Sequence, residues 1–167
     1  MKIHKIILSL SIACSILLFG CPYESKISLS NPSESVIDTT LLGLWENVSP
    51  SNNSGISSME IYSFNGHEYL VATFGRENGG IMMQNFRSFG SIVNHENFLN
   101  IQEVGNSAKF KFYNYFISND TLNVAAASDK FSKEQFSSRE ELINYFVKNI
   151  DDPKFFEGYT SFVKKKR

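Results

Sequence analysis

Residues 109–127 read KFKFYNYFISNDTLNVAAA, and this stretch indicates the fold class. Apolar and polar side chains alternate through 109–117 and again through 121–127, which is the pattern of two strands that each bury one face. Asn119-Asp120 separates the two segments and predicts a turn. The stretch therefore predicts an antiparallel hairpin, with Lys109 and Lys111 on its polar face. Phe110, Phe112 and Phe116 share the other face of the first strand, and Leu122, Val124 and Ala126 line one side of the second.

The same period of two recurs along most of the chain after residue 41. Asn65-Gly66 lies between two such segments and is a strong signal for a hairpin turn. The glycines within residues 75–80 mark a further turn. The predicted strands are 43–48, 59–64, 67–74, 81–87, 98–103, 109–117, 121–127 and 159–165.

One helix is predicted near residues 138–150. Residues 138–141, Ser-Arg-Glu-Glu, fit a capping box, in which the serine and the last glutamate satisfy backbone N–H groups at the helix start. Leu142, Phe146 and Ile150 then repeat at intervals of four and form an apolar stripe. An Asp-Asp-Pro sequence follows and ends the helix.

These elements indicate a mainly β fold, a single domain over residues 41–167 with antiparallel strands in meander order. The expected architecture is a small lipocalin-like β-barrel, because closure removes the exposed edges of a sheet, and a β-sandwich is the alternative. Gly43-Leu44-Trp45 resembles the Gly-x-Trp element of lipocalin-like barrels. This resemblance implies a tryptophan that closes one end of the barrel beneath a cation, supplied by the Lys-Lys-Lys-Arg run at 164–167.

The first twenty residues have the arrangement of a secretory signal peptide. Lys2 and Lys5 precede an apolar stretch, residues 6–19, which is followed by Gly20 and Cys21. A helix over that stretch would be about 21 Å long at about 1.5 Å per residue, short of a hydrocarbon core of about 30 Å. We therefore expect residues 1–20 to be removed rather than to form a permanent membrane span.

The sequence Leu18-Phe19-Gly20-Cys21 resembles the lipobox of bacterial lipoproteins. The resemblance implies cleavage between Gly20 and Cys21 and attachment of acyl chains, such as palmitate, to the Cys21 thiol. Two or three chains hold a protein firmly, because each buried methylene contributes about 0.8 kcal/mol. The expected localisation is the bacterial cell envelope. Pro22 differs from the acidic residue of an inner-membrane retention signal and so favours the outer membrane.

Residues 21–40 are predicted to form a lipidated, flexible tether. The segment is rich in serine, contains Pro22 and Pro32, and shows no sustained period of two or 3.6. Such a segment would hold the folded domain away from the lipid headgroups.

A wider resemblance covers most of the mature chain. The Cys-Pro start, residues 36–38 and 41–45, the Glu68-Tyr69-Leu70 strand and the late helix are similar to a group of uncharacterised bacterial lipoproteins. This resemblance supports the shape and the location, and it implies no activity and no functional residues.

Charge and cysteine content exclude several classes of function. Loss of residues 1–20 removes Lys2 and Lys5 from the 16 basic residues and none of the 17 acidic residues, so the net charge falls from −1 to −3. That balance argues against nucleic-acid binding. With Cys14 removed and Cys21 acylated, no thiol is left for a disulfide, a metal site or catalysis. The sequence predicts neither a metal site nor a cofactor.

The mature chain has two histidines, His67 and His95, each followed by a glutamate. Neighbouring residues on a strand point to opposite faces, so we interpret both histidines as surface residues rather than metal ligands. The sequence also lacks the Gly-x-Ser-x-Gly, His-Glu-x-x-His and phosphate-loop motifs. These observations predict a protein that is not an enzyme.

The expected function is non-enzymatic binding by a membrane-anchored domain. Two hypotheses remain open: a carrier for a small apolar ligand, and an interaction or structural protein with a filled barrel that contacts an envelope protein. A hydrolase without a recognisable motif is a third. The aromatic residues that would line a pocket in the carrier hypothesis are Tyr62, Phe64, Phe86, Phe110, Phe112, Tyr113 and Tyr115.

Overall fold

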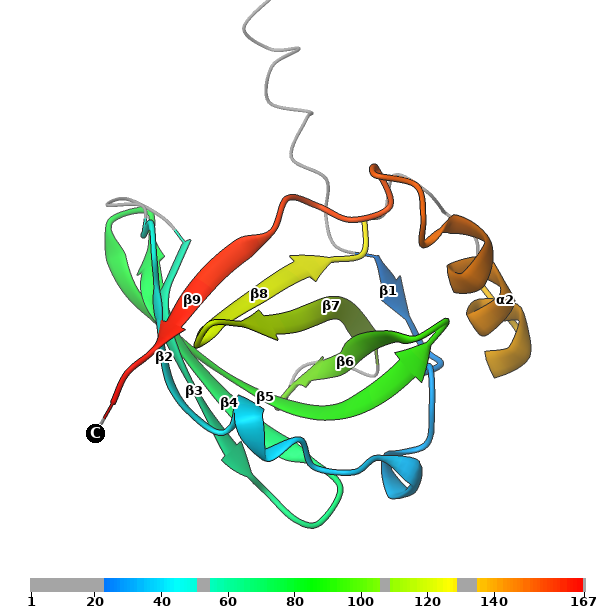
Figure 1. The fold of residues 1–167 in the computed structure, drawn as a ribbon, viewed down its shortest axis with the longest axis horizontal. Coiled ribbons are helices and arrows are strands. Elements are labelled where there is room, and N and C mark those ends of the chain that lie inside the picture. The colour runs from blue at the N-terminus through cyan, green and yellow to red at the C-terminus, as the bar shows by residue number, and fades with distance from the viewer. Residues whose placement is uncertain (1–22, 51–54, 106–108, 129–134, 167) are drawn as a thin grey trace, which may run out of the picture.

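The computed structural model describes residues 23–50, 55–105, 109–128 and 135–166. Its main feature is a closed barrel of antiparallel strands in which neighbours along the chain are also neighbours in the sheet (Figure 1). The first strand of the barrel pairs with the last, so the sheet has no free edge there. The prediction of a mainly β barrel with one helix near the C-terminus is therefore confirmed, and the sandwich alternative is wrong.

Among the described residues, eight strands form the barrel, and a short additional strand, two 3₁₀ helices and one α-helix lie outside it. The barrel strands are β2 (Gly43–Asn47), β3 (Gly55–Ser63), β4 (Tyr69–Glu77), β5 (Gly80–Val93), β6 (Glu96–Glu103), β7 (Phe110–Ser118), β8 (Thr121–Ala126) and β9 (Thr160–Lys164). The other elements are β1 (Glu24–Ser25), η2 (Pro32–Glu34), η3 (Thr39–Leu41) and α2 (Arg139–Asn149). Each predicted strand has its counterpart, and β5 is the longest of them.

Three connections between strands are two-residue turns with positive φ at both positions: Asn78-Gly79, Asn94-His95 and Asn119-Asp120. This conformation matches the twist of a hairpin, and Asn, Asp and Gly adopt it most readily. The hairpin predicted at Asn65-Gly66 forms, but neither of these two residues has a positive φ. Its hairpin is joined by a longer loop, in which the Asn65 side chain accepts hydrogen bonds from two backbone N–H groups.

The start of α2 follows the prediction closely. Ser138 is the N-cap, and its hydroxyl accepts a hydrogen bond from the backbone N–H of Glu141. The Glu141 carboxylate receives hydrogen bonds from Ser137 rather than from the N-cap backbone. In a capping box the glutamate carboxylate binds the backbone N–H of the N-cap residue. Here it binds Ser137, one residue before the N-cap.

The segment from Tyr23 to Leu41 is packed against the barrel and is not a free tether. Tyr23 and Leu29 are buried, and β1 pairs with the start of β7. The buried Asn100 amide accepts a hydrogen bond from the Leu29 N–H at 2.8 Å, and Ser35 accepts one from the Gly90 N–H at 2.9 Å. The structure differs from the expectation here because the serines of this segment bind barrel groups.

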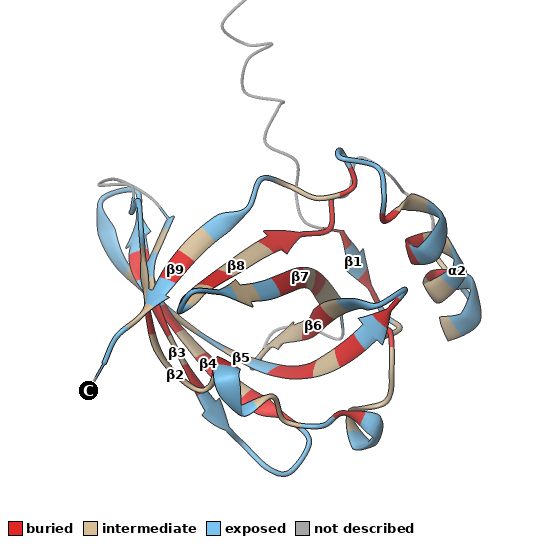
Figure 2. Ribbon diagram, in the orientation of Figure 1, coloured by how far each residue is buried: buried red, intermediate tan, exposed pale blue. Residues whose placement is uncertain are grey.

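The barrel wall is buried on its outer face where α2 and the N-terminal segment cover it. Figure 2 shows buried residues on the side of α2 that faces the barrel. Phe112 on β7 points to this side, whereas Tyr113 points into the barrel. The predicted apolar face of β7 is therefore its outer face. We call the buried residues here the outer cluster: Tyr23, Leu29, Val93, Phe98, Phe112, Ala127, Leu142, Phe146, Ile150 and Phe155.

An ion pair stabilises the loop between β3 and β4. The Glu68 carboxylate accepts hydrogen bonds from Arg87 Nε at 2.6 Å and Nη2 at 2.8 Å, and from Asn65 Nδ2 at 2.8 Å. The Arg87 hydrogen bonds outweigh the effect of burial, so the pKa of Glu68 lies below its usual value.

Replacing Glu68 with glutamine is expected to lower the free energy of unfolding by about 1 kcal/mol at pH 7, because Arg87 is half exposed and its ion pair is screened. A lowered pKa in the folded state gives stabilisation that is present above the unfolded value, about pH 4.3, and that is lost as the pH falls through the folded value. Urea titrations of both proteins from pH 7 to pH 3 should converge at acid pH. Glu77→Gln, at the exposed end of β4, is the control, and a gap of the same size from pH 7 to pH 3 would contradict the ion-pair explanation.

Candidate functional site

The barrel encloses a cavity of about 570 Å³. All eight barrel strands contribute to its wall. Its size lies within the range of about 300–1,000 Å³ that is typical of small-molecule pockets. The apolar side chains of its wall are Ile56, Met59, Ile61, Val71, Phe86, Leu99, Ile101, Tyr113, Leu122, Val124, Ala126 and Phe162.

One end of the cavity reaches solvent. Ser49, Gly55, Gly158 and Thr160 line it there and are exposed. We call this the open end of the barrel. The polar side chains that line the cavity are Asn47, Ser49, Thr73, Gln84, Lys111, Glu157 and Thr160.

Charged groups of both signs lie at the open end. Lys111 lines the cavity, and its ammonium is 3.7 Å from the Glu24 carboxylate, with both groups partly exposed. Burial raises the pKa of Tyr113 to about 12, and the negative charge of Glu157 adds to the shift. The Tyr113 hydroxyl therefore remains protonated near neutral pH and can donate a hydrogen bond. The site combines apolar walls with polar groups at its mouth, as an amphipathic ligand requires.

The opposite end is closed by Trp45 and the chain that precedes it. The Trp45 indole N–H donates to the Leu41 carbonyl at 2.8 Å, and Lys164 Nζ lies 5.1 Å from the centre of the indole ring. Lys164 thus supplies the cation that the Gly-x-Trp resemblance implied. Gly43 has a φ of +126°, and a Cβ there would lie 3.3 Å from Lys164 Cε. The positive φ, rather than the contact with the flexible lysine side chain, favours glycine at this position.

Asp38 forms hydrogen bonds that hold the segment before β2 across the closed end. Its backbone N–H donates to the Tyr69 hydroxyl at 2.6 Å, and its carboxylate accepts from the Tyr115 hydroxyl at 3.4 Å. Burial and the nearby Asp38 charge raise the pKa of Tyr115, so this hydroxyl also stays protonated. The closed end is therefore filled by apolar rings and internal hydrogen bonds.

The predicted aromatic lining is only partly correct. Phe86 and Tyr113 line the cavity, whereas Tyr62 and Phe64 are exposed. Phe110 and Phe112 pack with the outer cluster, and Tyr115 belongs to the closed end. Most of the wall is aliphatic and was not singled out from the sequence. The alternation within residues 98–103 and 121–127 could have identified these wall residues. The inward side chains of the two segments, Leu99, Ile101, Leu122 and Val124, line the cavity.

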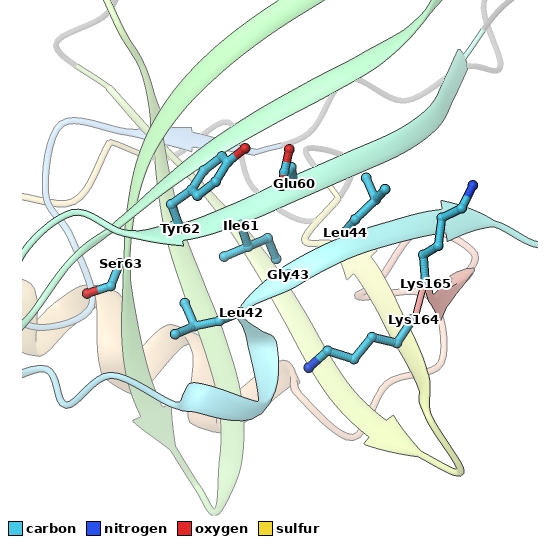
Figure 3. A pocket seen from close by; sticks show the side chains of 9 residues that line it. All are labelled: Leu42, Gly43, Leu44, Glu60, Ile61, Tyr62, Ser63, Lys164 and Lys165. Atoms are coloured by element: carbon cyan, nitrogen blue, oxygen red, sulfur yellow. The ribbon is translucent and has the colours of Figure 1, made fainter. Parts of the chain in front are cut away.

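A second hollow of about 400 Å³ lies on the surface beside the first residues of β2 (Figure 3). Lys164 and Lys165 border it, and Figure 3 shows their side chains on opposite sides of the strand. Lys164 donates to the Thr40 carbonyl, and Lys165 pairs with Glu46. Because both cations already bind groups of the protein, this hollow is a weaker candidate for a ligand site than the barrel interior.

The two histidines do not converge on a common site. His67 Nδ1 is 2.7 Å from the Ser35 carbonyl, and His95 occupies the turn between β5 and β6. Within the part of the chain that the structure describes, no three His, Cys, Asp or Glu side chains form a group that could hold a metal ion.

Gly20 and Cys21, the predicted cleavage and acylation positions, lie outside the described residues, as does the predicted signal peptide. The described part of the chain contains no helix with the length and apolarity needed to cross a bilayer.

Comparison with known proteins gives no relatives for this chain. No protein family, no curated protein and no solved structure matches it.

Proposed function

We propose that this protein is a bacterial envelope lipoprotein, anchored through acylated Cys21, whose barrel binds a small apolar ligand without catalysing a reaction. One observation carries the binding proposal: a cavity of about 570 Å³ that is mostly apolar, closed at one end and open at the other. The lipoprotein-like N-terminus carries the anchoring proposal. The outer membrane is the proposed location.

The distribution of large side chains explains why the interior is hollow. An eight-stranded barrel is just wide enough either to be filled by its own side chains or to hold one small ligand. Here the rings of Phe98, Phe112, Phe146 and Phe155 pack outside the barrel, and Trp45 fills one end. Phe86, Tyr113 and Phe162 line part of the remaining space, and most of its other apolar lining is aliphatic. This arrangement favours the carrier hypothesis over a structural protein with a filled barrel.

Filling the cavity is expected to abolish most of the binding. Val124 lies on the wall of the cavity, so a Val124→Phe variant should bind a fluorescent apolar probe, N-phenyl-1-naphthylamine, about tenfold more weakly, or about 1.4 kcal/mol. Titration of residues 21–167, which contain every described strand, would measure this affinity.

Val163→Phe is the matched control, because Val163 lies on the adjacent strand β9 and is 43% exposed on the outer face. This variant should bind the probe as the unmodified chain does. Equal affinities in the two variants would place the probe on the surface and contradict the proposal. Native mass spectrometry of protein purified from envelope extracts would then identify a natural ligand by its co-purification.

A further inference from the structure

We propose that the open end of the barrel faces the lipid bilayer, so that the cavity takes an acyl chain directly from the membrane. This inference rests on the proposed function, and it identifies both the surface that contacts the membrane and the class of ligand. It comes from the position of β1 relative to the cavity.

The N-terminal strand β1 lies at the open end. Glu24 pairs with Lys111, which lines the cavity, and the Tyr23 N–H donates to the Ala127 carbonyl at 2.8 Å, directly after the cavity residue Ala126. In Figure 1, β1 lies in the upper half of the molecule, whereas the loop between β3 and β4 lies at the bottom. The chain therefore enters the fold beside the mouth of the cavity.

The distance from the anchor to the mouth is limited by covalent geometry. Tyr23 lies two positions after Cys21, and an extended chain spans at most about 3.6 Å per residue, so the two Cα atoms are at most about 7 Å apart. Because Tyr23 is fixed in the outer cluster, acyl chains on Cys21 would begin beside the mouth. The chain between Cys21 and Tyr23 is therefore too short to let the barrel rotate freely relative to the anchor.

The rim at this end presents apolar side chains to the solvent. Phe74 and Met83 form a cross-strand pair on the outer face of the β4–β5 hairpin, and Ile81 near its tip is 94% exposed. Val48 and Val104, which follow β2 and β6 at the same end, are also exposed. Interfacial segments bury such side chains about 5–10 Å into the headgroup region. A bilayer at this position would cover the rim and bring lipid chains to the cavity.

Depth-dependent fluorescence quenching tests this orientation. Residues 21–167 retain Cys21 as their only cysteine, which can be coupled to a maleimide lipid in phosphatidylcholine vesicles that carry brominated acyl chains. An Ile81→Trp variant should lose most of its added emission to the bromines. Ile92→Trp is the matched control, since Ile92 is 74% exposed at the other end of β5, beyond its pairing with β4 and next to the turn into β6, and it should keep its emission. Trp45, buried at the closed end, gives the background.

Quenching of Ile92→Trp equal to or stronger than that of Ile81→Trp, or no quenching of either, would overturn the proposal. Chemical coupling makes the result independent of natural acylation. Probe binding by the same proteins without vesicles reports separately on the cavity, so an orientation that fails while the probe still binds rejects this inference alone. Loss of probe binding with Ile81→Trp still quenched would reject the ligand and leave only the orientation.

Discussion

A Phe146→Ala variant should lose about 3–5 kcal/mol of its free energy of unfolding in urea, which is the usual cost of removing a buried phenylalanine side chain. Phe146 is fully buried, and its ring centre lies 5.4 Å from Phe98, 5.3 Å from Phe112 and 5.1 Å from Phe155. All three contacts are edge-to-face, which is a geometry that aromatic pairs prefer. Since domains of this size are stable by about 5–15 kcal/mol, the loss is a large part of the total.

The neighbouring Val147 provides the control, because it is 44% exposed on the same helix. Val147→Ala should stay within about 0.5 kcal/mol of the unmodified chain. The folded fraction of Phe146→Ala should bind an apolar probe with unchanged affinity, because Phe146 belongs to the outer cluster and does not line the cavity. A loss below about 1 kcal/mol would show that α2 packs loosely and would contradict this role for the outer cluster.

The strands were predictable because their side chains alternate and their turns have specific residues. Residues 98–103 and 121–127 were identified by alternation alone, and both lie in strands of the barrel. Asn119-Asp120 forms the turn that its composition indicates, and the hairpin indicated by Asn65-Gly66 also forms, but through a loop longer than two residues. In that loop the Glu68–Arg87 ion pair and the Asn65 side chain favour another conformation, and these contacts are not visible in a dipeptide signal.

The faces of β7 show why the site was harder to predict than the strands. Alternation separates two faces but does not say which one lies inside the barrel. Phe112 faces α2 and Tyr113 faces the cavity, so aromatic residues occur on both sides of the same strand. The faces are settled only by the packing of α2, which is distant in the sequence. The aromatic set of the carrier hypothesis therefore mixed residues of the cavity with residues of the outer cluster.

The N-terminal segment was misread for a related physical reason. A serine-rich sequence without a period looks like a linker, because its polar groups are expected to bind water. Here Ser30 and Ser35 instead bind Ser91 and the Gly90 backbone, and Asn100 binds the Leu29 N–H. These partners lie about sixty or seventy positions away in the chain. Short-range patterns do not contain that information.

Replacing Cys21 with serine should release the exported protein from the membrane fraction. A serine hydroxyl is not acylated at a lipobox, so the variant would lose two or three lipid chains, each methylene of which contributes about 0.8 kcal/mol to membrane binding. The expected change is nearly complete, because these acyl chains supply most of the proposed affinity for the bilayer. Fractionation of cells followed by washing of the membranes at high pH would measure it.

This experiment must distinguish membrane binding by the lipid from membrane binding by the leader, because an uncleaved precursor can remain bound through residues 6–19. The Cys21→Ser variant should therefore carry the signal peptide of a soluble exported protein in place of residues 1–20. Cys14→Ser in the natural leader is the matched control: it removes the other cysteine and should leave both the membrane association and the acylated N-terminus, detected by mass spectrometry, unchanged. If Cys21→Ser stays on washed membranes, or if the natural product begins with an unmodified thiol, the anchor is not lipid on Cys21. The rim at the open end would then be the surface left to explain binding to the envelope.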